Sequence, residues 1–351
     1  MELNLPRSQR VLAMDIGAHS IKIIEGKETK KGIVVSKYFT IDTPEGVVKD
    51  GLILDKELMH YVVSEKLRKK KIKTKNIYIT INSSNIITRE ISIPKVAEDE
   101  IHSLLMFQME DYLPVNIEDY VFQHKVLDVF YEDNMEKMNL LIIAIPKEVV
   151  EGYFYLLKGL GLNPLVMDYQ PNSIAKLIDY NDFINNTFST EDITFAIIDI
   201  GYDSTKISIV KNGKILVSRL VEIAGNYIDQ SILNFNDISL DEVENIKGEI
   251  DNINRINEDS SHSNALNIIK SSIVLLSEKI EMVFKYYLSR KPDNIINYIL
   301  LTGGISNIKG LDNMFTNIFN IPSISIEALD KVDFEGNFAL YANAIGSIIR
   351  F

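Results

Sequence analysis

The same pattern of hydrophobic and polar positions occurs twice in this chain, about half a chain apart. Residues 11–26 read VLAMDIGAHSIKIIEG, and residues 196–213 read AIIDIGYDSTKISIVKNG. Each copy has a short apolar run, a turn that contains glycine, and a segment in which isoleucine alternates with polar residues. Such a succession predicts a β-hairpin. Two matching hairpins predict two related lobes that face each other and share something between them.

Segments around the hairpins also show the periodicity of regular structure. We expect strands at 32–44, 77–81, 86–93, 120–130 and 139–145, and helices at 54–70, 98–112 and 147–159. The helix at 98–112 places Ile101, Leu104 and Leu105 on one face, and we expect this face to pack in the core. Together these patterns predict that residues 84–165 form a small α+β unit inserted in the first lobe.

The second half of the chain predicts a lobe with added helices. Residues 234–267 are polar, and we expect a helix at 240–250, a flexible surface loop, and a long helix at 265–288. The first lobe then comprises residues 1–83 and 166–190, and the second comprises residues 191–351. A helical subdomain occupies about 226–290 of the second lobe, and the last helix of the chain packs back on the first lobe.

Composition narrows the class of protein. A chain of 351 residues exceeds the roughly 250–300 at which one hydrophobic core stops growing, which agrees with two lobes. Cysteine is absent, which excludes thiolate chemistry, and the five histidines are scattered and never paired at ligand spacing, which argues against a zinc site. The net charge of −12 argues against nucleic acid as a partner, but ATP needs only local donors. Residues 1–10 lack the apolar stretch of a signal peptide, and we expect a cytoplasmic chain.

The hairpin turns carry the residues that suit a nucleotide. Glycine lets the backbone approach an anion, and the N–H groups of such a turn form an anion-binding nest. Asp15 and Asp199 suit a magnesium ion held partly through water, since magnesium keeps most of its waters. Lys22 adds a point charge, and two serines add hydroxyl donors. One Asp-Ile-Gly alone is most often a plain turn, but two copies with matching serine and lysine favour a functional site.

A third glycine-containing turn follows an apolar run near the C-terminal end. Residues 300–311 read LLTGGISNIKGL, in which Gly303 and Gly304 end a strand and polar residues open a helix. Paired glycines let a backbone lie flat against a base or a ribose. On its own this pattern is weak, because such a pair is usually only a turn.

These three elements, in this order, resemble the two phosphate loops and the adenosine loop of the actin-like ATPase superfamily. Within it the chain is similar to the PilM family of type IV pilus assembly proteins, which is related to the division protein FtsA. The resemblance covers essentially the whole chain and rests on SSNIITREISIP at 83–94, the acidic helix before Tyr112, Leu113 and Pro114, the strand pair, and GLGLNPLVMD at 159–168. It implies an α/β, actin-like ATPase fold with two related lobes around a nucleotide cleft and an FtsA/PilM-type inserted α+β subdomain.

The resemblance also implies a set of site residues. The nucleotide-binding set is Asp15, Gly17, Ala18, His19, Ser20 and Lys22 in the first loop, Asp199, Gly201, Tyr202 and Ser204 in the second, then Gly225, Asn226, Glu244, Lys247, Gly303, Gly304 and Ile305. Gln170 falls where the family holds a group that orients the attacking water, and Asp229 is a further candidate for the magnesium shell. Ala224 replaces a family glycine, which puts hydrolysis in more doubt than binding.

The implied function is a cytoplasmic ATP- and magnesium-binding platform for type IV pilus assembly, with weak ATPase activity at most. Its implied partner is the short cytoplasmic N-terminal segment of the bitopic membrane protein PilN, with other inner-membrane pilus components beside it. Self-association is compatible with the family, and recruitment to the cytoplasmic face of the inner membrane would follow from the partners. A filament-forming, FtsA-like protein and a small-molecule kinase of the same superfamily are the alternatives. FtsA-like proteins use a C-terminal amphipathic helix on membranes, and we expect none here.

A basic run, KLRKKKIKTK at 66–75, has two interpretations. Its position at the end of an expected helix favours a solvated helix end. Contact with anionic lipid is the alternative that such a cluster suggests.

Overall fold

A computed structural model of the chain describes residues 9–112, 115–236, 238–249, 252–254 and 260–350. In the first lobe, six strands form one sheet in the order β10-β6-β1-β2-β3-β18. Their bounds are β1 Val11–Ile16, β2 Ser20–Thr29, β3 Gly32–Asp42, β6 Asn76–Ile81, β10 Asn163–Tyr169 and β18 Val332–Asp333. A separate pair of short strands, β4 Val48–Lys49 and β5 Leu52–Ile53, precedes the first helix.

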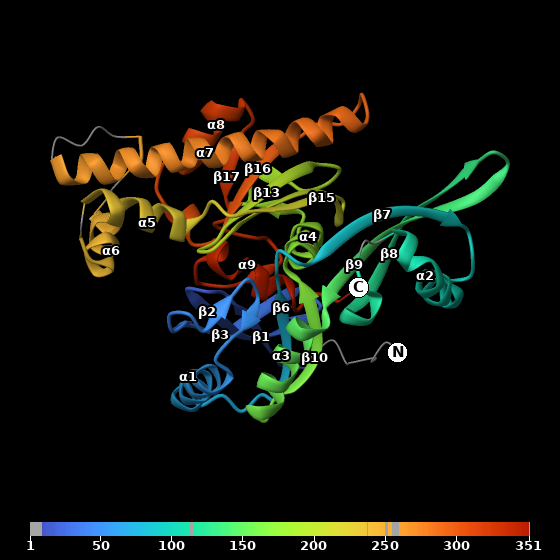
Figure 1. The fold of residues 1–351 in the computed structure, drawn as a ribbon, viewed down its shortest axis with the longest axis horizontal. Coiled ribbons are helices and arrows are strands. Elements are labelled where there is room, and N and C mark those ends of the chain that lie inside the picture. Colours follow the sequence, from blue (N-terminus) through green and yellow to red (C-terminus); the bar gives the residue numbers. More distant parts are fainter. Residues whose placement is uncertain (1–8, 113–114, 237, 250–251, 255–259, 351) are drawn as a thin grey trace.

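The helices of the first lobe cover the outer face of its sheet. α1 Lys56–Lys69 and α3 Lys147–Gly159 pack against each other and against the sheet (Figure 1). Met59 and Val63 of α1 and Tyr153 of α3 are fully buried in the core cluster on this face. The amphipathic pattern of both helices is therefore explained, because each buries one apolar stripe against the sheet.

The second lobe repeats the strand order of the first. Its sheet runs β15-β14-β13-β16-β17, which matches β3-β2-β1-β6-β10 strand for strand. The bounds are β13 Thr194–Ile200, β14 Thr205–Lys211, β15 Lys214–Val221, β16 Tyr298–Thr302 and β17 Ser323–Ser325. Both predicted hairpins are confirmed, because β1 pairs with β2 and β13 with β14, antiparallel in both cases. The sequence repeat is thus a repeat of structure.

Helices cover the outer face of the second sheet (Figure 1). They are α5 Gly225–Asn236, α6 Leu240–Glu249, α7 Ser260–Arg290, the short η2 Ile305–Asn307 and α8 Leu311–Phe319. The helices expected at 240–250 and 265–288 correspond to α6 and α7, and α7 begins earlier than expected. Of the surface loop expected between them, residues 251 and 255–259 lie outside the described residues, and residues 260–264 belong to α7 instead.

The inserted unit is a three-stranded sheet, in the order β7-β9-β8, with one helix. It comprises β7 Ile87–Pro94, α2 Glu98–Tyr112, η1 Ile117–Asp119, β8 Tyr120–Glu132 and β9 Met135–Pro146. Ile101 and Leu105 of α2 are buried against the sheet, as expected of that helix face. The unit ends at Pro146, earlier than the expected residue 165, because the apolar stripe of α3 and the strand β10 are buried with the first lobe.

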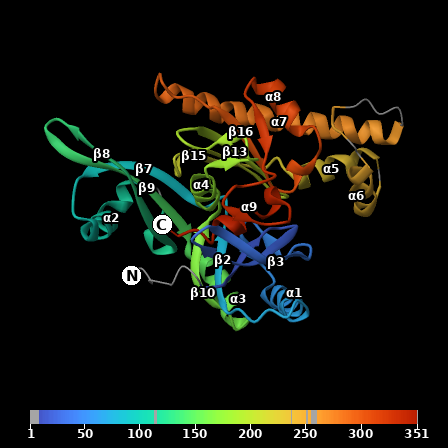
Figure 2. The same ribbon diagram turned by 180° about the vertical axis from the view of Figure 1, so that it is seen from behind.

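Two helices lie between the sheets of the two lobes, as Figure 2 shows from behind. α4 Gln170–Tyr180 follows β10, and α9 Phe338–Gly346 follows β18. Their apolar residues join one core cluster with residues of both sheets, which include Ala13 and Ile197. A small ribbon, β11 Phe183–Ile184 and β12 Phe188–Ser189, continues from α4. The last helix therefore lies against the first lobe and connects it to the second.

Replacing Gly346 by alanine should lower the free energy of unfolding by about 1–3 kcal/mol, because it overpacks this crossing. A Cβ atom at Gly346 would lie 2.2 Å from the carbonyl oxygen of Ser173 in α4. Gly248→Ala in α6 is the matched control, since its Cβ would meet nothing within 4 Å, and it should be neutral or stabilising. Urea unfolding measures both. Equal stability of Gly346→Ala and the unmodified chain would refute the tight crossing.

Candidate functional site

The turns of the two hairpins face each other across the gap between the lobes. The rings of His19 and Tyr202, one from each turn, lie with their centroids 4.9 Å apart. Each turn closes with the same bond, from the Gly17 N–H to the Ser20 carbonyl at 3.1 Å and from the Gly201 N–H to the Ser204 carbonyl at 3.2 Å. Ala18 lies between Gly17 and His19 in the first turn. The residues predicted for the two phosphate loops thus lie in two equivalent turns.

Asp15 is the next-to-last residue of β1 and is buried, 4% exposed. Its Oδ1 accepts hydrogen bonds from Thr80 Oγ1 at 2.7 Å and from Gln170 Nε2 at 2.6 Å. Thr80 stands beside it on the parallel strand β6, and Gln170 is the first residue of α4. Gln170, predicted to orient a water, therefore contacts the first carboxylate directly.

Asp199 holds the matching, next-to-last position of β13 and is 5% exposed. Its Oδ2 accepts a hydrogen bond from Asn343 Nδ2 of α9 at 3.2 Å and lies 3.6 Å from Lys206 Nζ. Gly303 packs tightly here: its φ is +88°, and a Cβ would lie 2.6 Å from Asp199 Oδ1. Only glycine fits that conformation and that approach without strain. The third loop is thereby held against the second carboxylate.

Lys22 lies close to both carboxylates. It pairs with Asp15 across the first hairpin, and its Nζ donates to the Ser20 carbonyl at 3.2 Å. Burial lowers the pKa of Lys22, while the negative charges of Asp15 and Asp199 oppose that shift. A half-buried cation that lies near two carboxylates and beside the glycine turns is suited to meet additional negative charge.

Asp229 of α5 and Lys247 of α6 form a second ionic cluster beside the turns. Lys247 Nζ lies 2.8 Å from both Asp229 Oδ1 and Glu244 Oε1. Burial raises the pKa of Asp229, whose side chain also feels the charge of Lys247 and lies near His19. Because Asp229 is fully buried and holds Lys247, its geometry favours positioning of that lysine over a place in a magnesium shell.

The remaining predicted residues pack around the second turn. The N–H of Gly225 donates to the Gly201 carbonyl at 3.1 Å, and the N–H of Asn226 donates to the Tyr202 carbonyl at 2.8 Å. A Cβ at Gly225 would lie 3.3 Å from both Ile305 Cδ1 and Tyr202 Cδ2. The start of α5 and the loop of Gly303, Gly304 and Ile305 are therefore brought together with the second hairpin turn.

Four residues at the site were missed from the sequence, namely Thr80, Lys206, Thr302 and Asn343. Lys206 could have been found, because it holds the place of Lys22 in the second copy of the repeat. Thr302 stands beside Asp199 on β16 as Thr80 stands beside Asp15 on β6. No sequence signal distinguishes Asn343, which reaches Asp199 from a helix 144 residues away.

Several polar atoms at this site are buried without a hydrogen-bond partner in the described part of the chain. They are Gln170 Oε1, Asn343 Oδ1, Thr302 Oγ1 and Asp229 Oδ2. Buried polar atoms are almost always paired, so such a group indicates a place for water or ligand. Among the described residues there is no group of three or more His, Asp and Glu that could hold a metal by itself. Magnesium with a polyphosphate needs only one or two carboxylates, so the residues fit that pair.

Comparison with solved structures identifies the class. EutJ, the ethanolamine utilization protein of Carboxydothermus hydrogenoformans, is 15% identical, with a TM-score of 0.56 over 98% of this chain and 90% of that one. MreB5 of Spiroplasma citri bound to AMPPNP is 15% identical, with a TM-score of 0.54 over 97% and 96%. The chain has the actin-like ATPase fold, as predicted.

Comparison within that class identifies the family. A chain of the PilM–PilN type IV pilus biogenesis complex is 21% identical, with a TM-score of 0.81 over 98% of both chains. The sequence profile of the family described as type IV pilus assembly protein PilM matches residues 13–341. The chain belongs to this family, and the resemblance seen in the sequence is confirmed.

Proposed function

We propose that this chain binds ATP with magnesium between its lobes and acts as a platform in type IV pilus assembly. The observation that carries the first half is the pair of equivalent glycine turns, each with a buried carboxylate at its base and Lys22 close to both. A polyphosphate between the turns would meet their backbone N–H groups and this lysine. Family membership supports the second half.

Particular residues would hold each part of the ligand. Asp15 and Asp199 would hold the magnesium ion, partly through water, and the ion would neutralise phosphate charge. The second turn, with Ser204, and the first, with Ser20, would contact the phosphates. Lys247 and Glu244 would contact the adenosine from α6, positioned by Asp229. Gly303, Gly304 and Ile305 would lie against the base or ribose.

Hydrolysis on this site should be slow or absent. Gln170 is the candidate for orienting a water, and its Nε2 already donates a hydrogen bond to Asp15 Oδ1 at 2.6 Å. A glutamine side chain positions a water through its Oε1, but it is not a general base at neutral pH. Ala224 adds a methyl group just before Gly225, at a buried position beside the second turn. Nucleotide would therefore set the balance between open and closed lobes more than it would be turned over.

Asp15→Ala and Asp199→Ala should abolish most of the thermal stabilisation that MgATP gives the chain. A ligand that binds only the native state raises the unfolding temperature in proportion to its binding free energy. Asp192→Ala, an exposed carboxylate before β13 and outside both turns, is the matched control and should keep the shift. The comparison uses thermal unfolding with and without MgATP, with circular dichroism to verify the fold. A full MgATP shift in either variant would remove that carboxylate from the proposed site.

We further propose that the inserted unit binds the N-terminal cytoplasmic segment of a PilN-like membrane protein. The matched structure is a PilM–PilN complex, which supports this partner. β8 lies at the edge of its sheet, so one side of its main chain faces away from β9. Val126 and Val129 on this strand are 38% and 45% exposed. An extended peptide can pair with such an edge, main-chain bonds giving affinity and side chains giving selectivity.

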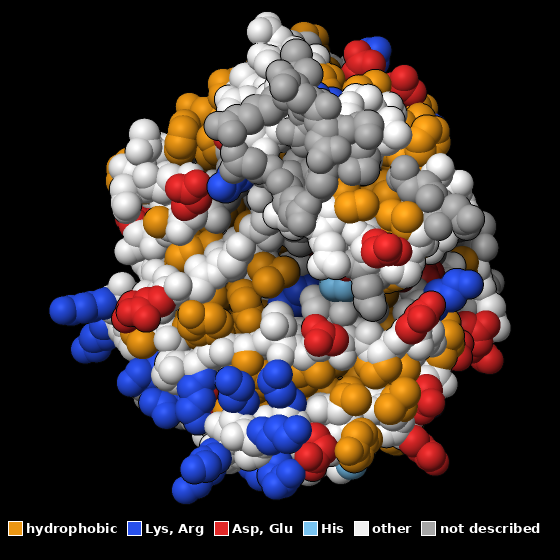
Figure 3. All heavy atoms as spheres, turned by 90° about the vertical axis from the view of Figure 1, so that its left-hand side faces the viewer, with side chains coloured by type: hydrophobic (Ala, Val, Ile, Leu, Met, Phe, Trp, Pro, Cys, Tyr) orange, Lys and Arg blue, Asp and Glu red, His pale blue; other side chains and the backbone are white. Residues whose placement is uncertain are grey.

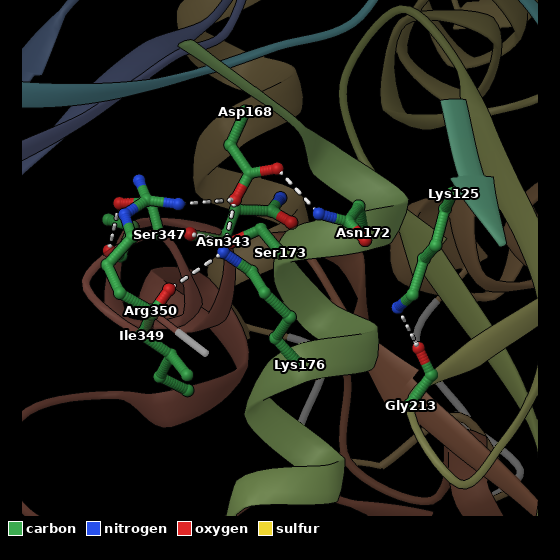
Figure 4. A network of polar contacts seen from close by, with 11 residues as sticks. Lys125, Asp168, Asn172, Ser173, Lys176, Gly213, Asn343, Ser347, Ile349 and Arg350 are labelled. Atoms are coloured by element: carbon green, nitrogen blue, oxygen red, sulfur yellow. Dashed lines mark hydrogen bonds and ion pairs between the residues drawn. The ribbon is translucent and has the colours of Figure 1, made fainter. Parts of the chain in front are cut away.

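Contacts between the inserted unit and the second lobe give nucleotide a route to this edge. Lys125 of β8 donates to the Gly213 carbonyl at 3.2 Å (Figure 4), and Lys214 donates to the Leu127 carbonyl of β8. Arg290 at the end of α7 bonds Glu90 of β7 at 3.0 Å. A movement of the second lobe would therefore shift the inserted sheet. The partner would hold the chain at the cytoplasmic face of the membrane.

A synthetic peptide of the first residues of the neighbouring membrane protein should bind the full chain with micromolar or better affinity. Replacing residues 87–146 by a short Gly-Ser linker should abolish binding, since those residues form their own sheet and core. Fluorescence anisotropy measures both, and MgATP stabilisation of the linker variant verifies its lobes. Binding that survives the replacement, or no binding by the intact chain, would contradict this assignment.

A further inference from the structure

One face of the first lobe gathers exposed cations although the chain as a whole is acidic. We call it the basic face, and all of its cations but the half-buried Lys66 are exposed; they are Lys37, Lys66, Arg68, Lys69, Lys70, Lys71, Lys73 and Lys75. α1 lies at the lower left of the molecule in Figure 1, and Lys and Arg side chains gather at the lower left in Figure 3. The net charge of −12 means that the surface elsewhere is strongly negative.

Contacts hold these cations side by side. The Lys70 ammonium lies 5.8 Å from the ring centre of Phe39 in β3. Glu25 of β2 bonds Thr74 Oγ1 at 2.5 Å with one oxygen and lies 3.4 Å from Lys37 Nζ with the other. The end of α1, the segment after it and the strand β3 therefore meet at one surface.

The backbone that carries the lysines is fixed. α1 closes with bonds from the Ile72 N–H to the Leu67 carbonyl and from the Lys71 N–H to the Arg68 carbonyl, both at 3.0 Å. Lys71 takes a φ of +52°, at the place in this helix ending that glycine usually occupies. Further along, the Lys75 carbonyl accepts from the Asn163 N–H at 2.7 Å. The backbone that presents Lys71, Lys73 and Lys75 is therefore held at both ends of the segment.

Neither helix chemistry nor local ion pairing explains this face. Cations in the last turn of a helix offset its dipole, but that effect ends within the turn and leaves Lys71, Lys73 and Lys75 unexplained. These three side chains are exposed and alternate with the partly buried Ile72 and Thr74, so they share one side of an extended segment. Within the described residues, Arg68 and Lys37 have carboxylate partners, and the other six cations have none.

We propose that the basic face docks on an anionic phospholipid surface. A cluster of this size next to a membrane is attracted to anionic headgroups, and the negative remainder of the chain is repelled, so the two effects together orient the molecule. No described helix could span a membrane, so such a contact would be peripheral. Nucleic acid fits less well, because single strands are held by stacking on aromatic side chains, and Phe39 under Lys70 is only 6% exposed. The proposal takes up the second of the two interpretations of residues 66–75, contact with anionic lipid.

Co-sedimentation of the full chain with vesicles tests this proposal. The chain should bind phosphatidylcholine vesicles that contain phosphatidylglycerol, should not bind phosphatidylcholine alone, and should be released by salt. Lys69→Gln, Lys71→Gln and Lys73→Gln together should weaken binding about a hundredfold, since each lysine near an anionic surface contributes about fivefold. The matched control, Lys279→Gln, Lys285→Gln and Lys291→Gln, removes the same charge from the α7 side and should bind like the unmodified chain.

Three results would overturn the proposal. One is the absence of binding to the anionic vesicles at low salt. Another is equal loss in the two triple variants, which would show a nonspecific charge effect. The third is tight binding of a single-stranded oligonucleotide that is lost in the first variant while vesicle binding is not. Unchanged unfolding temperatures would show that both triple variants are folded. Peptide binding and MgATP binding are measured separately, so that a failure of the lipid proposal is distinguished from a failure of the proposed function.

Discussion

Lys22→Ala should weaken MgATP binding about a hundredfold or more, a loss of about 3 kcal/mol. Lys22 is half-buried, and burial lowers its pKa while the charges of Asp15 and Asp199 oppose that shift, so its charge is screened less than it would be in water. Removing a charged group that meets an oppositely charged ligand in a site sheltered from water typically costs about 2–5 kcal/mol. A triphosphate in this cleft would then face two carboxylates without their cation. Isothermal titration calorimetry measures the change.

The pH dependence of binding follows from the same pKa. A lysine whose pKa is lowered from 10.5 loses its proton at a lower pH than an exposed lysine does. MgATP affinity should therefore fall as the pH rises into the alkaline range, and Lys22→Arg should flatten this fall, since arginine stays charged. Lys27→Ala, on the same strand, is the control for general charge. Unchanged affinity of Lys22→Ala would remove this lysine from the site.

Asp168→Ala should lower the free energy of unfolding by about 3–5 kcal/mol. Asp168 lies at the end of β10 and is buried, and its Oδ2 is 2.5 Å from Lys176 Nζ in α4 (Figure 4). Asn172 donates to its Oδ1 at 2.8 Å, and the Arg350 guanidinium lies 4.0 Å from Oδ2. Loss of the carboxylate leaves a buried lysine without its counter-charge. Urea unfolding followed by circular dichroism measures this cost.

A double variant separates the ion pair from simple packing. Asp168→Ala with Lys176→Met removes both charges, and it should recover a large part of the stability, because an apolar pair often replaces a buried ion pair without loss. Lys176 also donates to the Ile349 carbonyl at 3.0 Å, so the pair connects β10 and α4 to the segment after α9. Additive losses in the double variant would show that the two residues do not act together.

Much of the fold could be predicted because its repeat is visible in the sequence. A hairpin with a glycine turn needs alternating apolar and polar residues beside the turn. Asp15 and Asp199 stand at matching positions just before the two turns. The helix face of Ile101 and Leu105 follows from a period of 3.6 residues, and both are buried as that pattern requires. Local chemistry was therefore sufficient for the elements and the turns.

The parts that could not be predicted depend on contacts between distant segments. The amphipathic pattern of α3 is the same whether it packs on the inserted sheet or on the first lobe, and in the structure its apolar residues are buried with those of the first lobe. Asn343 and Arg350 reach Asp199 and Asp168 from the end of the chain, and nothing near them in the sequence marks that role. Such contacts are set by tertiary packing, which no local periodicity encodes.

The central claim is that MgATP binds between the lobes, and calorimetric titration of the full chain tests it most directly. We expect a single site per chain, weaker binding when EDTA removes magnesium, and loss in Asp199→Ala, whose carboxylate is 5% exposed beside Lys206 and Asn343. Folded protein that shows no heat of binding with MgATP would contradict the account, as would equal affinity in Asp199→Ala.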